Sequence, residues 1–189
     1  MTEWVHVGRL WTNGEPYLAM DSVLLPRWRG WSDDSYNKMI VPLPQEVNAV
    51  VVGDRAVAVV GVDEGWIEVF CAEDDRVALV QGSGGSKLHE ALAHPEDGDL
   101  DGGTIEVTKG YLALLNAAID GTGQYSGELV EAQPGRVPDA RALSPSDEPD
   151  PGGLLLQVRP GVYRLRVRWM TQLADGSSFA RWSLTIEDG

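Results

Sequence analysis

The stretch GVYRLRVRW, residues 161–169, alternates apolar and basic side chains along most of its length. In an extended strand successive side chains point to opposite faces, so this segment has one apolar face and one basic face. The apolar face carries Tyr163, Leu165, Val167 and Trp169, and the basic face carries Arg164, Arg166 and Arg168. The pattern predicts a β-strand whose apolar face packs on a core.

The three arginines of this strand allow two interpretations. We expect them to pair with acidic side chains on neighbouring strands, as is common on a solvent-facing sheet. The alternative is an anion or substrate site on the same sheet face. Such a site needs further hydrogen-bond donors, and the sequence does not single any out.

Outward from this strand, strand-like runs occupy much of the chain. Runs rich in β-branched and aromatic residues lie at 4–11, 49–53, 56–62, 66–72, 104–107, 111–115, 127–132, 154–158 and 179–187. Gly53-Asp54 separates two of these runs, which predicts a hairpin turn. We therefore predict a mainly β fold, at the margin of α+β, built as an antiparallel β-sandwich-like pair of sheets.

One or two short helices are expected beside the strands. The segment SKLHEALAH, residues 86–94, has Ser86 as an N-cap, an apolar stripe that includes Leu88 and Leu92, and Pro95 after its end. A shorter helical turn is expected in VLLPRW, directly after Asp21-Ser22. Neither segment is long enough to change the predicted fold class.

We expect a single domain over residues 1–189, interrupted by a flexible insertion at about 132–153. That insertion is rich in proline and has no aromatic residue, and long loops of this kind are uncommon inside a compact domain. The two halves of the chain also resemble each other. PYLAMDS (16–22) matches GYLALLN (110–116), and WIEVFCAED (66–74) matches WSLTIED (182–188), which predicts two pseudo-repeated β units.

The charge of the chain is concentrated in its middle. The formal net charge is −14, and all of it arises between Asp63 and Asp150. Such acidity opposes direct binding to nucleic acid, because phosphates are repelled, and it suits a basic partner protein. One cysteine, no recognisable secretory segment and no apolar run of the roughly 20 residues that a membrane helix needs predict a cytoplasmic protein.

No constellation of residues in the sequence predicts catalysis. His6 alternates with valines on an expected strand, and His89 and His94 are five residues apart, so they lie on different helix faces. Cys71 ends an apolar run, where most cysteines are buried and inert. The nucleophile elbow and the phosphate-binding loop are both absent. We therefore expect a protein that is not an enzyme and that needs no cofactor.

The stretch PEDGDLDGGTIEV, residues 95–107, begins as a calcium loop does, with Asp97, Asp99 and Asp101 at alternate positions before Gly102. A calcium loop of the helix-loop-helix type needs a bidentate Glu at its twelfth position, and that position here is Thr108. A strand pattern also stands where the second helix should follow. A solvated acidic turn is the favoured interpretation, and calcium binding is the alternative.

The sequence resembles the immunity protein 21 family, antitoxins of bacterial polymorphic-toxin systems. The resemblance rests on GEPYLAMDSVLLPRWRG (14–30), AVVVGDRAVAVV (49–60), WIEVFCAED (66–74), GGTIEV (102–107), GYLALLNAAIDG (110–121) and VRPGVYRLRVR (158–168). Residues 132–153 depart from the pattern because they are longer and richer in proline. The resemblance implies a protein that binds and neutralises a cognate toxin by occlusion, without catalytic residues.

Two classes of function therefore stand at this point, an immunity protein and a β-rich ligand-binding or regulatory module. For the first, we expect acidic residues to steer a basic, nuclease-type toxin, because complementary charge accelerates association. The expected partner-binding residues are Glu73, Asp74, Asp75, Glu96, Asp97, Asp99 and Asp101. For the second, the ligand would be calcium at Asp97, Asp99 and Asp101, or a molecule on the arginine-bearing sheet face.

Overall fold

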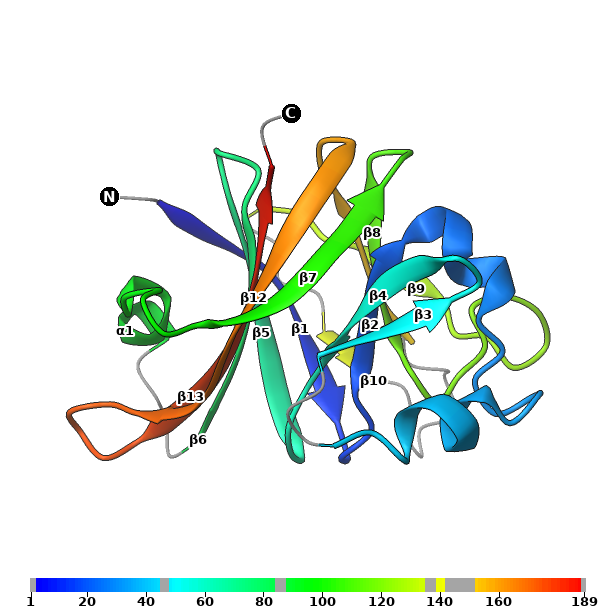
Figure 1. The fold of residues 1–189 in the computed structure, drawn as a ribbon, viewed down its shortest axis with the longest axis horizontal. Helices are drawn as coiled ribbons and strands as arrows, with labels where there is room; N and C mark the ends of the chain where they lie inside the picture. Colours follow the sequence, from blue (N-terminus) through cyan, green and yellow to red (C-terminus); the bar gives the residue numbers. More distant parts are fainter. Residues whose placement is uncertain (1–2, 45–47, 84–87, 135–138, 142–151, 188–189) are drawn as a thin grey trace.

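The structure is a computed structural model that describes residues 3–44, 48–83, 88–134, 139–141 and 152–187. It contains two sheets that face each other (Figure 1). From edge to edge the seven-stranded sheet runs β10 (Asp139–Arg141), β1 (Trp4–Thr12), β5 (Gly65–Ala72), β6 (Val77–Ser83), β13 (Ser178–Ile186), β12 (Gly161–Gln172), β7 (Leu100–Val107). The six-stranded sheet runs β3 (Ala49–Val52), β4 (Arg55–Val60), β2 (Tyr17–Asp21), β8 (Tyr111–Asn116), β11 (Gly153–Gln157), β9 (Leu129–Glu131).

The predicted mainly β, antiparallel architecture is confirmed. Neighbouring strands pair antiparallel, apart from the parallel pairs β1–β10 and β9–β11. On β12, Tyr163, Leu165 and Val167 are buried and the arginines between them are not, as the alternation predicts. The predicted hairpin joins β3 to β4, and Gly53 turns it with a φ of +67°, a conformation that other residues adopt only with strain.

Three apolar clusters hold the described part of the chain together. The largest lies between the two sheets and includes Leu10, Leu79, Leu114 and Trp182. A second covers the outer face of the six-stranded sheet, beneath the 3₁₀ helix η1 (Ser22–Arg27) and the π-helix η2 (Tyr36–Ile40). The third covers the outer face of the seven-stranded sheet, beneath the short helix α1 (Leu88–Ala93).

The two halves of the chain repeat one strand order, although the edge strand β9 pairs parallel with β11 where β3 pairs antiparallel with β4. The order β1-β5-β6 on one side of the seven-stranded sheet is mirrored as β13-β12-β7 on the other side, and β3-β4-β2 is mirrored as β8-β11-β9 in the other sheet. The predicted match of 16–22 with 110–116 fits, because β2 and β8 occupy equivalent central positions and pair with each other. The match of 66–74 with 182–188 is wrong, since β5 is equivalent to β12 and β13 is equivalent to β6.

Several elements differ from the sequence-based prediction. β2, β6 and η2 were not expected, and β10 forms a short strand inside the proline-rich segment. Within that segment, residues 135–138 and 142–151 lie outside the described residues, as does the predicted cap Ser86. The helical turn after Asp21 is confirmed as η1, with the Asp21 side chain accepting a hydrogen bond from the amide of Val23.

Candidate functional site

Asp99, the middle acid of the 97–101 stretch, is fully buried rather than solvated. Its side chain has 0% exposure and pairs with two guanidinium groups, Arg168 Nε at 2.5 Å and Arg181 Nη2 at 3.0 Å. These arginines come from β12 and β13, far along the chain. A buried carboxylate is tolerated when it is paired in this way. The expectation of a solvated acidic turn is therefore wrong for Asp99.

The same two arginines hold the C-terminal end of α1 and the loop that follows it. Arg181, itself 2% exposed, donates to the carbonyl oxygens of Ala91 at 2.7 Å and His94 at 2.9 Å. Arg168 donates to the carbonyl oxygens of Pro95 at 2.9 Å and Asp97 at 2.7 Å. Orphan carbonyls at the end of a helix need donors, and here cationic side chains from the sheet supply them. Asp99 and its arginines thus fix α1 on the seven-stranded sheet.

Asp97 and Asp101 have surroundings that differ from those of Asp99. Asp101 lies in β7, accepts from the amide of Gly103 and pairs with Arg164 of β12 at 3.1 Å. The Gly103 amide, followed by Arg164, lowers the pKa of Asp101. Asp97 is exposed. Among the described residues no group of three His, Cys, Asp or Glu side chains is placed to hold a metal ion.

The ion-pair interpretation of the arginine face of β12 is confirmed for two of its arginines. Arg164 pairs with Asp101 and with Glu187 on either side, and Arg168 pairs with Asp99. Arg166 lies opposite Asp101 in the β7–β12 register. This face therefore already carries its counterions.

The second predicted acidic cluster, Glu73, Asp74 and Asp75, forms the turn between β5 and β6. Arg76 follows directly and pairs with Asp74 at 2.8 Å, while its guanidinium lies 5.5 Å from the Trp4 ring centre. Asp74, and more weakly the charge of Glu96, raise the pKa of Arg76. Arg76 therefore lies between the two predicted acidic clusters, and the fold brings them to one region although they are about 20 residues apart in sequence.

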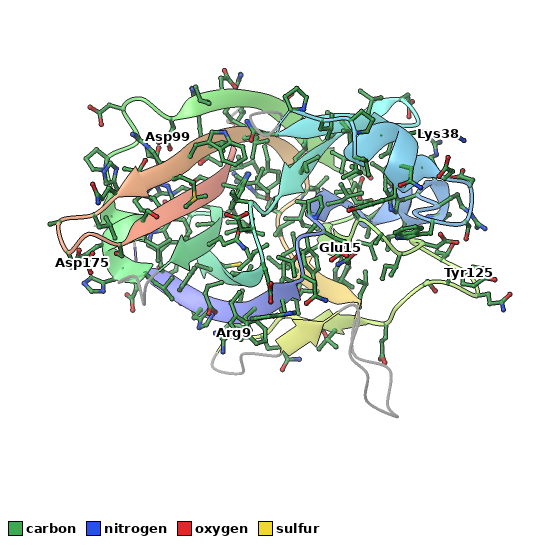
Figure 2. All side chains as sticks on the ribbon, turned by 90° about the horizontal axis from the view of Figure 1, so that it is seen from below. Arg9, Glu15, Lys38, Asp99, Tyr125 and Asp175 are labelled. Carbon is green, nitrogen blue, oxygen red and sulfur yellow. The ribbon has the colours of Figure 1, made fainter. Side chains whose placement is uncertain are left out.

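A groove of about 740 Å³ lies in this region, between α1 and the outer face of β1 and β5. We call it the α1 groove. Its apolar lining comes from Trp4, Phe70, Leu88 and Leu92, and its polar lining includes Arg76 and Glu96. All three histidines of the chain line it as well. Figure 2 labels Asp99 at the end of the molecule where the loop after α1 lies.

His6 packs on the outer face of the seven-stranded sheet. Its ring stacks on Phe70 at 4.8 Å between centroids, and its Nε2 lies 2.8 Å from a carboxylate oxygen of Glu68. Glu68 also pairs with Arg9. A mostly buried carboxylate between two basic side chains fixes this part of the sheet surface and leaves the ring of His6 as a wall of the groove.

The described lining of the groove offers no hydroxyl or thiol nucleophile. The described residues that line it include no serine, threonine or cysteine. Cys71 lies outside it, and burial raises the pKa of its thiol to about 11. A thiol with so high a pKa is almost wholly protonated at neutral pH and is a poor nucleophile.

Comparison with protein-family models, with curated proteins and with solved structures found no match. The described part of the chain also contains no helix of the length and apolarity needed to cross a membrane.

Sequence reasoning missed the residues that assemble this region. Arg181 was not singled out, although its position in FARWSL between two large buried side chains is a usable signal. Phe179, Arg181 and Trp182 are all buried, so β13 is covered on both faces. An arginine inside such a strand predicts a buried carboxylate partner, but not which of the chain's 29 acids it is.

Proposed function

We propose that this protein is an immunity protein, which binds and neutralises a cognate bacterial toxin by occlusion, with the α1 groove as its docking surface. The observation that supports this proposal best is that one apolar groove is lined by both Arg76, which directly follows the acidic turn 73–75, and Glu96 of the second acidic segment. Protein interfaces commonly combine a water-excluding apolar centre with a charged rim.

The structure divides the seven predicted partner-binding residues by their availability. Asp99 is buried, while Asp74, Asp75 and Asp101 form ion pairs with Arg76, Arg159 and Arg164. The remaining three are Glu73, Glu96 and Asp97. All three are exposed, and none forms a close ion pair with another described residue. We propose that these three steer a basic toxin toward the groove, because unpaired exposed charges contribute most to long-range attraction.

The groove floor would supply the stable contact after steering. Trp4 and Phe70 are aromatic, and buried aromatic anchors carry much of the energy of protein interfaces. A volume of about 740 Å³ is large enough to receive side chains of a partner. Binding of this kind needs no catalytic group on the immunity protein.

Co-expression with the product of the neighbouring gene tests the function. The expected result is a stoichiometric complex on size exclusion and rescue of growth from the toxin. Trp4→Ala should weaken the complex, whereas Trp31→Ala, which truncates an exposed tryptophan at the other end of the molecule, should leave it intact. A toxin that is neither bound nor neutralised would contradict the proposal.

A ligand-binding module is the second candidate, and the groove favours it too. Small-molecule sites are concave, mostly apolar and about 300–1,000 Å³ in volume, and the α1 groove, at about 740 Å³, falls in that range. Native mass spectrometry of the protein purified without a partner distinguishes the two candidates. A bound molecule displaced by Leu92→Trp would favour the ligand-binding module.

A further inference from the structure

A second recess lies at the end of the molecule opposite α1 and is walled by exposed aromatic rings. Its volume is about 490 Å³, and Trp31, Ser32, Ala118, Ile119 and Tyr125 line it. Trp31 is 60% exposed and Tyr125 is 64% exposed, unusually high values for such large side chains. Figure 2 shows Tyr125 at the far end from Asp99. We call this feature the aromatic recess.

The walls of the recess are held in place by the backbone around them. The Trp31 ring stacks on Tyr36 at 5.4 Å between centroids and 13° between planes. Gly30 precedes it with a φ of +45°, and a Cβ there would lie 2.5 Å from the carbonyl oxygen of Ile119. The chain before Trp31 therefore contacts the 117–126 loop directly. On the other wall, the amide of Asp120 donates to the carbonyl oxygen of Tyr125 at 3.1 Å.

A buried carboxylate, that of Asp120, is hydrogen-bonded to a residue that lines this recess. The Asp120 residue is 1% exposed, and its Oδ2 accepts from the hydroxyl of Ser32, which lines the recess. Arg29 approaches the same oxygen only to 3.6 Å. The other oxygen, Oδ1, has no hydrogen-bond partner among the described residues. A buried carboxylate oxygen without a donor is costly, so Oδ1 of Asp120 is a hydrogen-bond acceptor that the described residues leave unused, although Arg29 supplies a countercharge.

The rim of the recess adds further negative charge. Asp33 and Asp34 directly follow Ser32 and are exposed. The Ser35 hydroxyl, donating to the Asp33 carboxylate, lowers the pKa of Asp33, so this acid stays ionised at neutral pH. Lys38 lies 4.0 Å from Asp34 and offsets part of that charge.

We propose that the aromatic recess binds an organic cation, an alkylammonium or guanidinium group, between the rings of Trp31 and Tyr125. Aromatic faces attract such cations, Trp most strongly, and the three carboxylates around the recess outnumber the two cations Arg29 and Lys38 beside them, which increases the attraction. The site is independent of the α1 groove and of the proposed antitoxin function. The protein places guanidinium groups over tryptophan rings elsewhere, with Arg9 lying 4.1 Å from the ring centre of Trp66 and Arg76 lying 5.5 Å from that of Trp4.

The test is a titration of the intact protein followed by ¹⁵N NMR of the tryptophan indole groups, with Trp31 assigned through Trp31→Phe. Arginine amide, n-butylammonium and tetramethylammonium are the cationic probes, and 1-pentanol is the neutral one. We expect the Trp31 signal to shift saturably with the cations, at an affinity no tighter than millimolar, since a cation–π contact is weak. Trp66, already occupied by Arg9, is the internal control and should not shift.

Two variants keep the outcome decisive. Tyr125→Ala truncates an exposed ring and should weaken binding of arginine amide at least threefold with the fold intact. Asp120→Asn removes the negative charge and should weaken the binding of all three cations. It should not change the response to pentanol. Equal shifts with pentanol, or unchanged affinity in Tyr125→Ala, would overturn the proposal. A Gly-Arg-Gly peptide that binds more tightly than arginine amide would identify a polypeptide side chain as the source of the cation, and the reverse order would identify a free small molecule.

Discussion

The outer faces of the two sheets are covered in different ways. Over the six-stranded sheet, η1 and η2 bury a broad apolar cluster that includes Leu24, Trp28 and Ile40. Over the seven-stranded sheet, α1 contributes only one fully buried residue of its own, Ala91. Its Leu88 and Leu92 are only partly buried. Arg168, Arg181 and Asp99 supply much of the attachment there. The first cover is held mainly by apolar contact, and the second largely by buried charge.

The difference between the two covers explains why the groove beside α1 is larger than the one beside η2. A cover that fills the sheet face with apolar side chains leaves little space, whereas a six-residue helix tied down through its carbonyls leaves the neighbouring face of β1 and β5 open. The two covers should therefore respond differently to mutation. Mutations in the apolar cover should destabilise the whole fold, whereas mutations in the charged cover should cause local unfolding of α1.

The largest expected effect is that of Trp28→Ala on the apolar cover. The Trp28 residue is 1% exposed, and its indole N–H donates to the carbonyl oxygen of Ala117 at 3.1 Å. Its truncation leaves a cavity and an unpaired carbonyl, which should cost about 3–5 kcal/mol of unfolding free energy. Urea denaturation measures it. A loss below about 1 kcal/mol would show that this cover is loosely packed.

Asp99→Asn should have the next largest effect, on the charged cover. The substitution leaves Arg181 buried without a countercharge, which should cost about 3 kcal/mol. Amide hydrogen exchange should show the loss concentrated in α1 rather than spread over both sheets. The double variant Asp99→Leu with Arg181→Met should recover much of the stability, because no unpaired charge remains. Uniform exchange throughout the chain would contradict a local role.

Asp101→Asn, two residues along, should change stability far less than Asp99→Asn. Asp101 and Arg164 are both solvent-exposed at the ion pair, where screening makes such pairs weak. The folded state lowers the pKa of Asp101, so the contribution of the pair is present above the ordinary carboxyl pKa and is lost as pH falls through the lowered one. The unfolding midpoints of the unmodified protein and of Asp101→Asn should differ slightly at pH 7 and coincide in strong acid.

Calcium should have the smallest effect. A ligand that binds only the folded state raises the melting temperature by mass action. The carboxylates of Asp97, Asp99 and Asp101 do not converge, and Asp99 already has two guanidinium partners. We expect the melting temperature to be the same in about 1 mM calcium and in a chelator. A rise of several degrees that the chelator reverses would restore the calcium interpretation.

Sequence patterns predicted the features that depend on local periodicity. The alternation of 161–169 and the hairpin at Gly53 were both found, because strand faces and turns follow from neighbouring residues. The strand β6 was missed even though VALV is apolar, since a strand covered on both faces has no alternation to detect.

The candidate site could not be predicted in full, because it depends on pairings between distant segments. Asp99 meets arginines 69 and 82 positions away, and nothing near Asp99 distinguishes it from Asp97. The approach of the 73–75 turn to Glu96 likewise needs the position of α1 on the sheet. Local patterns selected the acidic segments, and the tertiary structure decided which acids are available.

The most direct test of the account is the rate at which the cognate toxin associates with a variant carrying Glu73→Lys, Glu96→Lys and Asp97→Lys. A matched control, Asp63→Lys, Glu64→Lys and Glu128→Lys, makes the same change in net charge at exposed acids away from the groove lining. We predict a slower association and a shallower salt dependence for the groove variant only, with unfolding curves unchanged. Equal association rates for the two variants across the salt series would contradict the α1 groove as the docking surface.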